Sequence, residues 1–242
     1  MLLALLLGIW LFKINCRKTG ITCPDLVDLM LILSICGIAG ARILYIVLFP
    51  HQFSSFADYA ALHEGGLVFF GGFAAAAVGL LIYLRRKKLP VAATFDCLIP
   101  PLAFGHAIGR LGCLLNNCCY GAATDMISIY RLPEDPPGCY RHPTQLYESI
   151  FLVAAGAVSN LLLHKKITGQ RLRPGILSGL YLAAYSLWRF LIEFWRDDDR
   201  GGFYTAMHLS PSQLGATVLM AIACLVVVYC YNYNAGSGDK NK

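Results

Sequence analysis

The stretch FGHAIGRLGCLLNNCCYG, residues 104–121, combines the composition of a membrane helix with polar groups that such helices rarely carry. Its glycines recur at helical spacing, so one face is bare backbone that a neighbouring helix or a lipid can approach. Arg110 lies one turn after His106, and both side chains therefore project from nearly the same side. An arginine in a membrane helix costs about 2.5–3.5 kcal/mol on insertion scales. The stretch therefore predicts either a functional site with an anionic partner or a structural arginine that reaches the interface.

The composition of the whole chain is that of a membrane protein. Its 242 residues are 57% hydrophobic and 14% charged, whereas soluble domains average roughly 45–50% and about 25%. No long polar linker interrupts the apolar runs, so we expect a single polytopic membrane domain over residues 1–242. The formal net charge of +6 resides in short loops between apolar runs. This pattern is a topology signal, and it argues against nucleic acid as a partner.

The apolar runs predict an all-α membrane protein, a bundle of seven transmembrane helices. They cover residues 1–12, 26–49, 67–84, 91–115, 145–163, 176–195 and 213–231. Six of them are long enough for the roughly 30 Å hydrocarbon core, which needs about 20 helical residues. The first run stops at Lys13 and is short. We expect an uncleaved, abbreviated first helix rather than a signal peptide, because no basic region precedes it and no small-residue cleavage site follows it.

Loop charges predict the orientation of the bundle. The first, third and fifth loops are basic, with Lys13, Arg17, Lys18; Arg85, Arg86, Lys87, Lys88; and Lys165, Lys166, Arg171, Arg173. The second loop has no lysine or arginine. Its histidines and acidic residues are His51, Asp58, His63 and Glu64, and the fourth and sixth loops mix both signs, with acidic Glu134, Asp135 and Asp197, Asp198, Asp199. Basic loops stay in the cytoplasm, so we expect the N-terminus outside and the C-terminus in the cytoplasm. The unusual polar residues then converge on the outer half of the bundle.

The charges expected in that outer half do not balance. Four arginines face two glutamates there: Arg42, Arg110, Arg189, Arg196, Glu148 and Glu193. Of these, Arg189, Glu193 and Arg196 are spaced i, i+4 and i+7 along one helical face. Unpaired buried arginines are costly, so an anion is expected to complete the site. Arginine holds phosphate through two parallel hydrogen bonds, which favours a phospholipid headgroup; the alternative is that some arginines reach lipid phosphates at the surface.

A second polar segment begins the fifth predicted helix. Residues 142–148 read HPTQLYE, with a proline in the first turn, where its missing N–H would be unpaired anyway. Gln145 and Glu148 lie one turn apart, with Tyr147 beside them. The segment is either an ordinary polar helix start or, beside Arg110, a hydrogen-bonding wall of the same pocket.

Several motifs follow one another in a fixed order over nearly the whole chain. They are Gly40-Ala41-Arg42 with Tyr45, Gly71-Gly72, Gly109-Arg110-Leu111-Gly112 with Asn116 and Tyr120-Gly121, the HPTQLYE segment, and Arg189-Phe190-Leu191-Ile192-Glu193 with Arg196. As a set they resemble the bacterial prolipoprotein diacylglyceryl transferase family. The resemblance implies a seven-helix enzyme of the bacterial inner membrane, with its active site toward the outer face and no cofactor. Such an enzyme moves the diacylglyceryl group of phosphatidylglycerol onto the lipobox cysteine of a prolipoprotein and releases glycerol phosphate.

The resemblance also implies roles for single residues. Arg110 and Arg189 match the family's two essential arginines and are expected to stabilise the phosphate and the leaving group, where charge builds up. Glu193 is expected to orient Arg189 or Arg196, and Gly121 to let lipid or backbone pass. The expected substrate-binding residues are Arg42, Asn116, Gly121, Gln145, Tyr147, Glu148, Arg196, Gly71 and Gly72.

The chain departs from the family at positions that matter for chemistry. Phe70 stands where the family has a histidine, Cys113 where it has an asparagine, and Cys118 where it has a glutamate. The family's N-terminal tyrosine region has no counterpart. The acceptor thiol, with a pKa of about 8.5, must lose a proton to react. We expect His106 and His142 as catalytic substitutes, since histidine titrates near neutral pH; the alternative is that both form only structural hydrogen bonds.

Cysteines supply the competing interpretation. The ten cysteines lack the CxxC pairs of zinc sites, so we expect no metal site. Cys118, Cys119 and Cys139 lie in an outer loop that faces an oxidising compartment. We expect a disulfide there between Cys139 and either Cys118 or Cys119. The alternative functions are a membrane thiol oxidoreductase that uses Cys118 and Cys119, and a non-catalytic phospholipid-binding homologue that lost its base at Phe70.

Overall fold

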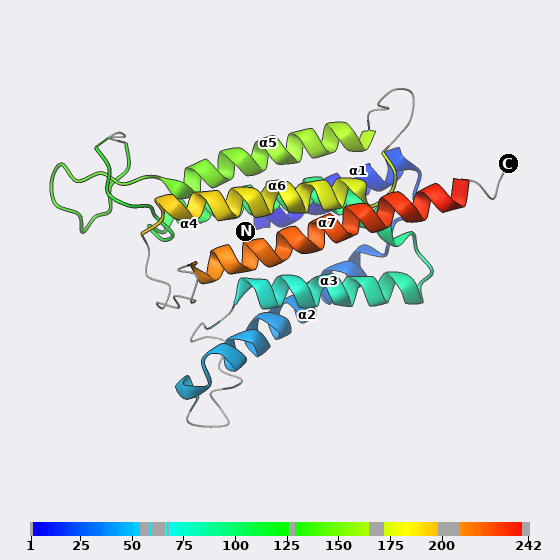
Figure 1. Cartoon of the computed structure of the whole chain (residues 1–242), viewed down its shortest axis with the longest axis horizontal. Coiled ribbons are helices and arrows are strands. Elements are labelled where there is room, and N and C mark those ends of the chain that lie inside the picture. The colour runs from blue at the N-terminus through cyan, green and yellow to red at the C-terminus, as the bar shows by residue number, and fades with distance from the viewer. Residues whose placement is uncertain are drawn as a thin grey trace. The chain divides into compact units, whose positions relative to one another are not determined.

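The computed structural model describes residues 2–53, 59, 66, 68–125, 129–164, 172–197 and 209–238. These residues form seven α-helices and two 3₁₀ turns: α1 (Leu2–Thr19), α2 (Leu26–Leu48), η1 (Pro50–Gln52), α3 (Phe69–Arg86), α4 (Val91–Leu115), α5 (Thr144–His164), α6 (Ile176–Ile192), η4 (Glu193–Trp195) and α7 (Pro211–Gly238) (Figure 1). Two isolated β-bridges are the only extended pairings within these ranges. The predicted all-α class is confirmed. The loop charges at positions 58, 63–64, 165–166, 171 and 198–199 lie outside the described residues.

Four of the described helices are long and apolar enough to cross a membrane. They are α2, α4, α5 and the Pro211–Asn232 part of α7. Their outward faces carry large apolar side chains such as Ile35, Leu161 and Leu225, which are more than half exposed. Water would not tolerate so continuous an apolar surface, whereas lipid does. The chain is therefore a multi-pass membrane protein.

Helix α1 is longer than the sequence pattern predicts. It continues beyond Lys13 to Thr19, so the basic residues of the predicted first loop lie within the helix. The reason is that its polar end has partners on neighbouring helices. Asn15 is fully buried; its Nδ2 donates to the carbonyl of Cys97 at 3.2 Å, and its Oδ1 lies 3.0 Å from His164 Nε2. A polar helix end is retained where its hydrogen bonds are made inside the protein.

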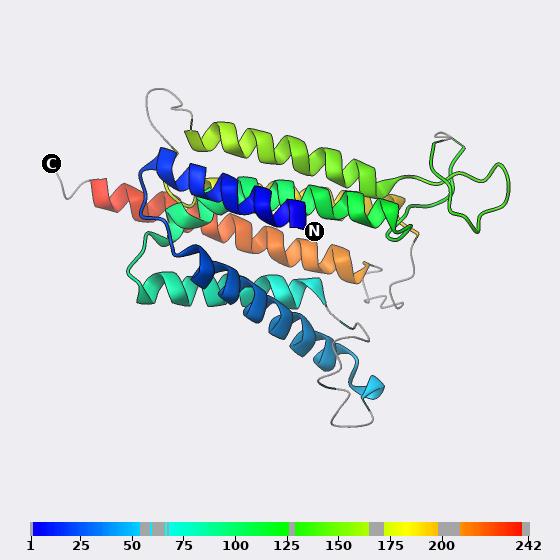
Figure 2. The same cartoon turned by 180° about the vertical axis from the view of Figure 1, so that it is seen from behind.

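The helices group into two compact units, Met1–Gly20 with Ala92–Lys242, and Ile21–Val91. The first unit holds α1, α4, α5, α6 and α7, and its core is formed by Ile99, Ala103, Ala107, Leu152, Tyr181 and Tyr185. Figures 1 and 2 show α5, α6 and α7 side by side in this unit. The end of α6, the start of α7 and the loop between α4 and α5 lie at one end, and the last turns of α1 and α7 lie at the other.

A buried carboxylate fixes the start of α6 against α4. Asp96 of α4 accepts hydrogen bonds from the backbone N–H of Gly175 at 2.6 Å and of Ser178 at 2.8 Å, and from the Ser178 hydroxyl at 2.6 Å. A carboxylate is favoured at a helix N-terminus, where N–H groups lack partners within the helix. Gly175 has a φ of +90°, which glycine adopts without strain. This cap sets the register of the helix that carries Arg189.

The second unit depends on a close crossing of α2 and α3. A Cβ atom added to Gly40 would collide with Ala75 and with the carbonyl of Gly71, and one added to Gly72 would lie 2.8 Å from the carbonyl of Gly37. Small residues allow membrane helices to pack backbone against backbone. Gly71 and Gly72, predicted to bind substrate, therefore occupy a helix-packing surface in the structure.

Gly40→Ala is expected to destabilise this unit by about 1–3 kcal/mol, the usual cost of overpacking a tight contact. Gly37→Ala is the matched control, because its nearest neighbours would be 4.0 Å away. The control is expected to leave stability unchanged or slightly raised, since alanine is the better helix former. Unfolding of the purified protein in mixed micelles measures both. Equal stability of the two variants would contradict the packing role.

Candidate active site

An ion pair between α4 and α5 forms the centre of the site. Arg110 Nη2 lies 2.9 Å from Glu148 Oε1, and the Glu148 side chain is completely buried while that of Arg110 retains 16% exposure. Tyr185 of α6 donates its hydroxyl proton to the same Glu148 oxygen at 3.3 Å. The next residue of α5, Ser149, donates its hydroxyl proton to the carbonyl of Ala107 at 3.2 Å and ties the two helices together. Such a pair is strongly coupled, because removing one partner leaves a buried charge.

Each member of this pair has one buried polar atom that the described residues leave unsatisfied. Arg110 Nε and Glu148 Oε2 have no hydrogen-bond partner in the part of the chain that the structure describes. A buried polar atom without a partner costs about 1–3 kcal/mol, so such atoms in a native site call for an explanation. An anion at the Arg110 edge and a hydroxyl donor at the Glu148 oxygen would satisfy both.

His106 belongs to the same cluster. Its Nε2 lies 3.9 Å from Glu148 Oε1, and its ring contacts that of Tyr185 at a centroid distance of 5.5 Å. Arg110 and Arg189 both lie within electrostatic range of the imidazole. His142 is held elsewhere, with Nδ1 3.3 Å from the hydroxyl of Tyr147. Of the two predicted histidines, the structure places His106 beside the Arg110–Glu148 pair.

A second ion pair anchors Arg189 at the end of α6. Its Nη1 lies 2.9 Å from Glu193 Oε2, and its Nη2 donates to the Ser212 hydroxyl at 2.9 Å. The Ser210 hydroxyl donates to the other Glu193 oxygen at 2.7 Å. Arg189 is only 5% exposed. The sequence left open whether Glu193 pairs with Arg189 or Arg196, and in the structure it pairs with Arg189.

The serines of this network come from the start of α7, which sequence reasoning missed. Ser210 and Gln213 form a reciprocal capping box, with Ser210 N–H donating to Gln213 Oε1 at 3.0 Å and Gln213 N–H to the Ser210 hydroxyl at 3.1 Å. Pro211 occupies the first helical position, where it is well tolerated. Residues 210–213 read SPSQ, a capping-box pattern that could have been recognised in the sequence. The box holds Ser210 and Ser212 against the Arg189–Glu193 pair.

Arg196 does not share a helical face with Arg189, and that prediction was wrong. Helix α6 ends at Ile192, and after one 3₁₀ turn Arg196 is extended, with φ −93° and ψ 148°. It pairs in antiparallel fashion with Gly121. A Cβ on Gly121 would lie 2.5 Å from the carbonyl oxygen of Trp195 and 2.7 Å from Cβ of His142. Gly121 therefore lets two backbone segments pass, which is one of its two expected roles.

The start of α5 holds the turn that follows α4. Gln145 Nε2 donates to the carbonyl of Cys118 at 2.7 Å, and the Thr144 hydroxyl donates to that of Cys119 at 2.8 Å. Gln145, predicted to line a pocket, thus fixes backbone. Asn116, also predicted to bind substrate, is exposed in the same turn.

The described contacts of Arg42 lie within the second unit. Its Nε donates to the carbonyl of Tyr59 at 3.3 Å, its Nη1 to that of Gly66 at 3.2 Å, and the guanidinium lies over the rings of Tyr45 and Phe53. Carbonyls and aromatic faces stabilise a buried guanidinium without a carboxylate. Its role in substrate binding stays a prediction.

All ten cysteines are thiols in the structure, so the expected bridge from Cys139 is not formed. Instead, the sulfur atoms of Cys113, Cys118 and Cys119 lie within 4.8 Å of one another. Burial and the neighbouring thiols raise the pKa of Cys118 to about 11. Redox-active thiols have lowered pKa values, so the raised pKa of Cys118 argues against its use in the oxidoreductase alternative. A search for CxxC pairs misses this cluster, because the turn after α4 brings Cys118 and Cys119 close to Cys113.

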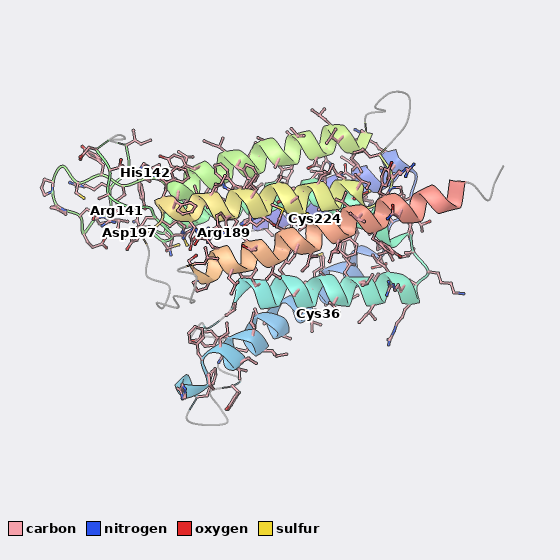
Figure 3. All side chains as sticks on the ribbon, in the orientation of Figure 1. Cys36, Arg141, His142, Arg189, Asp197 and Cys224 are labelled. Carbon is pink, nitrogen blue, oxygen red and sulfur yellow. The ribbon has the colours of Figure 1, made fainter. Side chains whose placement is uncertain are left out.

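A further ion pair, not predicted, orders the loop between α4 and α5. Arg141 binds both oxygens of Asp135, with Nε–Oδ2 and Nη2–Oδ1 distances of 2.8 Å, and its guanidinium lies over the ring of Tyr120 at 5.0 Å. A weaker contact joins it to Asp197 at 3.4 Å, and Figure 3 shows both residues at this end of the unit. The Arg141 guanidinium lowers the pKa of the Asp135 carboxyl below its ordinary value.

This ion pair predicts a pH-dependent loop. A carboxyl whose pKa is lowered by folding contributes stability above the unfolded pKa of about 4, and loses it as pH falls through the folded value. Asp135→Asn is expected to speed amide hydrogen exchange of residues 129–141 at pH 5–8, with the difference from wild type vanishing at the acid end. Glu134→Gln, at an exposed neighbouring position, is the control. Equal protection in all three proteins at pH 7 would contradict the ion-pair role.

Comparisons with known proteins agree with one another. A family model described as prolipoprotein diacylglyceryl transferase matches residues 1–229. A phosphatidylglycerol–prolipoprotein diacylglyceryl transferase of Dehalococcoides mccartyi is 33% identical over 225 residues, which cover 91% of this chain and 82% of the relative. An enzyme of the same name from Pasteurella multocida is 32% identical to this chain, over 95% of this chain and 85% of the relative. One from Synechococcus elongatus is 31% identical, over 98% of this chain and 83% of the relative. The match to the family model includes both ion pairs.

Proposed function

The chain belongs to the prolipoprotein diacylglyceryl transferase family, and we propose that its two anchored arginines bind the phosphate of phosphatidylglycerol during the transfer. It is a transferase of lipoprotein biosynthesis that moves the diacylglyceryl group from phosphatidylglycerol to a prolipoprotein. The acceptor in this proposal is the thiol of the lipobox cysteine. The observation that carries it is the Arg110–Glu148 pair, in which the buried Arg110 Nε has no hydrogen-bond partner among the described residues.

The reaction creates charge where the arginines lie. A thiolate attacks the glyceryl carbon, the carbon–oxygen bond to the phosphate breaks, and glycerol phosphate leaves with one additional negative charge. Preorganised donors aimed at developing charge are worth most in a site that excludes water. Arg110 offers its Nε edge, and Arg189 is held nearby by Glu193 and Ser212. Both guanidinium groups are fixed before the lipid arrives, so little is lost in orienting them.

Glu148 has a part in choosing the lipid. It fixes Arg110 through Oε1 and leaves Oε2 for a hydrogen-bond donor. The headgroup of phosphatidylglycerol ends in hydroxyl groups, which donate to a carboxylate. Phosphatidic acid carries the phosphate without these hydroxyls. We therefore place the glycerol headgroup against Glu148 and the phosphate against Arg110.

His106 is the proposed acceptor of the thiol proton. It lies beside Glu148, while Phe70 occupies the position of the family histidine. A general base must be within reach of the group that it deprotonates, and histidine is the side chain best suited near neutral pH. His142 is assigned a positioning role, because its ring contacts Tyr147 at the start of α5.

The proposal includes the orientation in the bacterial inner membrane. Arg17 and Lys18 end α1, and Arg173 donates to the carbonyl of Tyr231 near the end of α7, both at the end of the unit opposite the α4–α5 loop. Basic residues remain in the cytoplasm, which supports a site on the outer face. We propose seven membrane spans in one functional domain, with the N-terminus outside and the C-terminus inside. The shorter helices α1, α3 and α6 complete that count.

Transfer of labelled diacylglyceryl to a synthetic lipobox peptide tests the function. Purified protein in detergent is expected to label a peptide with cysteine at the acceptor position and not the matched peptide with serine. Phosphatidylglycerol is expected to serve as donor, and phosphatidic acid to fail because it lacks the headgroup hydroxyls. Tight binding of phosphatidylglycerol without any transfer would instead favour the non-catalytic lipid-binding alternative.

A further inference from the structure

Three thiols converge where α4 ends. Cys113 lies in the last turn of α4, and Cys118 and Cys119 lie in the turn that follows. Their sulfur atoms all lie within 4.8 Å of one another, and each residue is neither fully buried nor fully exposed. Each of the three residues therefore keeps part of its surface exposed.

The backbone around these thiols is held in an unusual conformation. Asn117 and Cys119 have φ values of +50° and +65°, in the left-handed region that side chains other than glycine rarely occupy. Such residues cost about 1–3 kcal/mol each and persist only where the surroundings impose them. Here the buried side chains of Gln145 and Thr144 bind the carbonyls of Cys118 and Cys119. The strain is concentrated at the position that brings the sulfurs together.

We propose that Cys113, Cys118 and Cys119 bind a Zn²⁺ ion and leave its fourth position open. Zn²⁺ binds thiolates at about 2.3 Å, which places tetrahedral sulfur ligands about 3.8 Å apart. The sulfur atoms lie within 4.8 Å of one another, so no pair has to approach by more than about 1 Å to reach that spacing. Three protein ligands with one open position is the arrangement of catalytic zinc sites, whereas structural sites use four.

The position of the cluster indicates what the open site receives. Arg110 lies one turn before Cys113, within electrostatic range of Cys113 and Cys119. Zn²⁺ with three thiolates carries a net charge of −1, which this guanidinium complements. Resting on the proposed function, we place the thiol of the acceptor cysteine in the fourth position. Zinc then favours its thiolate form, and this supplies the nucleophile in a chain that has Phe70 in place of the family histidine.

The step balances without an oxidant. The acceptor thiol gives its proton to His106 and binds zinc as a thiolate. Its sulfur forms a bond to the glyceryl carbon while the carbon–oxygen bond to the phosphate breaks. The bonding electron pair leaves with glycerol phosphate. The product is a neutral thioether, a weaker zinc ligand than a thiolate, so it dissociates and opens the position again.

Cobalt substitution tests the metal site on the intact chain. Protein purified without a histidine tag and incubated with Co²⁺ is expected to show the visible and near-ultraviolet absorption of tetrahedral cobalt thiolate, at one ion per chain. Cys113→Ser and Cys118→Ser are expected to weaken Co²⁺ and Zn²⁺ binding by more than about 100-fold, since each removes one of three ligands. Cys139→Ser, in the same loop but outside the cluster, is the matched control. A cobalt spectrum that survives Cys118→Ser, or no thiolate spectrum in wild type, would overturn the site.

Peptide addition tests the open position separately. The cobalt spectrum is expected to shift with the cysteine lipobox peptide and to stay unchanged with the serine peptide. An unchanged spectrum with both would overturn the acceptor role. Thiol counting on denatured, unreduced protein is a further check, and a disulfide within the cluster would overturn the proposal.

The two proposals fail in different ways. Full transfer by metal-stripped protein would leave the transferase function standing and remove zinc from it. A cobalt thiolate spectrum in protein that transfers nothing would keep the metal site and contradict the proposed function.

Discussion

Replacing Arg110 by alanine is expected to lower the rate of diacylglyceryl transfer by at least about 10²–10³-fold, the usual effect of removing one preorganised donor to developing charge. The Nε atom of this guanidinium has no hydrogen-bond partner among the described residues, and we propose that it binds the phosphate. Its loss removes stabilisation of the leaving group more than binding of the lipid tails. The decrease should therefore appear in kcat for labelled phosphatidylglycerol rather than mainly in KM.

This variant also needs a control for folding. Glu148 is completely buried, so Arg110→Ala leaves an unpaired charge at a cost of about 3–5 kcal/mol. The double variant Arg110→Gln with Glu148→Gln removes both charges and is expected to recover much of the stability without recovering transfer. Arg17→Ala, exposed at the opposite end of the unit, is expected to behave as wild type. A double variant that transfers at the wild-type rate would refute the role of Arg110.

Arg189→Lys is the second substitution with a large expected effect. Arginine uses separate nitrogens for Glu193 and Ser212, and a lysine ammonium cannot reproduce that planar fork. The charge is kept, but the group is no longer anchored in one orientation. Transfer is expected to fall by about 10²-fold, since one oriented donor is lost at the phosphate. Single-turnover kinetics with labelled lipid measures this decrease.

A matched pair separates geometry from charge. Arg173→Lys makes the same chemical change at an exposed position near the end of α7, and its rate is expected to be unchanged. Glu193→Gln keeps a hydrogen-bond acceptor beside Arg189 and is expected to cause a smaller loss than Arg189→Lys, because Glu193 acts through the arginine. Wild-type activity in Arg189→Lys would mean that charge alone suffices and that the anchoring by Glu193 and Ser212 is irrelevant to the reaction.

Sequence reasoning failed where a residue's role depends on where a helix ends. The i, i+4, i+7 spacing placed Arg196 on the face of Arg189, but α6 ends after Ile192 and Arg196 pairs with Gly121. Hydropathy likewise ended the first helix at Lys13, whereas Asn15 finds partners on α4 and α5 that keep the segment helical. Helix ends are decided by contacts with distant segments, which a local pattern does not contain.

The expected charge imbalance was also changed by tertiary structure. The sequence analysis counted four arginines and only two glutamates in the outer half of the bundle, and it therefore predicted that an anion completes the site. In the structure Glu148 pairs with Arg110 and Glu193 with Arg189, while Arg42 donates to carbonyls and lies over aromatic rings. The case for a phosphate ligand therefore rests on the unsatisfied Nε of Arg110 and not on a sum of charges.

By itself, the sequence determined the all-α membrane class, and it singled out the two arginines and two glutamates that form the two ion pairs of the candidate site. Membrane helices are chosen by local hydropathy, and a buried charge in one is rare enough to be noticed from composition alone. Only the tertiary structure decided which carboxylate meets which arginine, and that Cys113, Cys118 and Cys119 form one cluster. These pairings join segments from different helices and turns. Their geometry follows from packing and from backbone hydrogen bonds such as those of Gln145 and Thr144, which no local sequence pattern encodes.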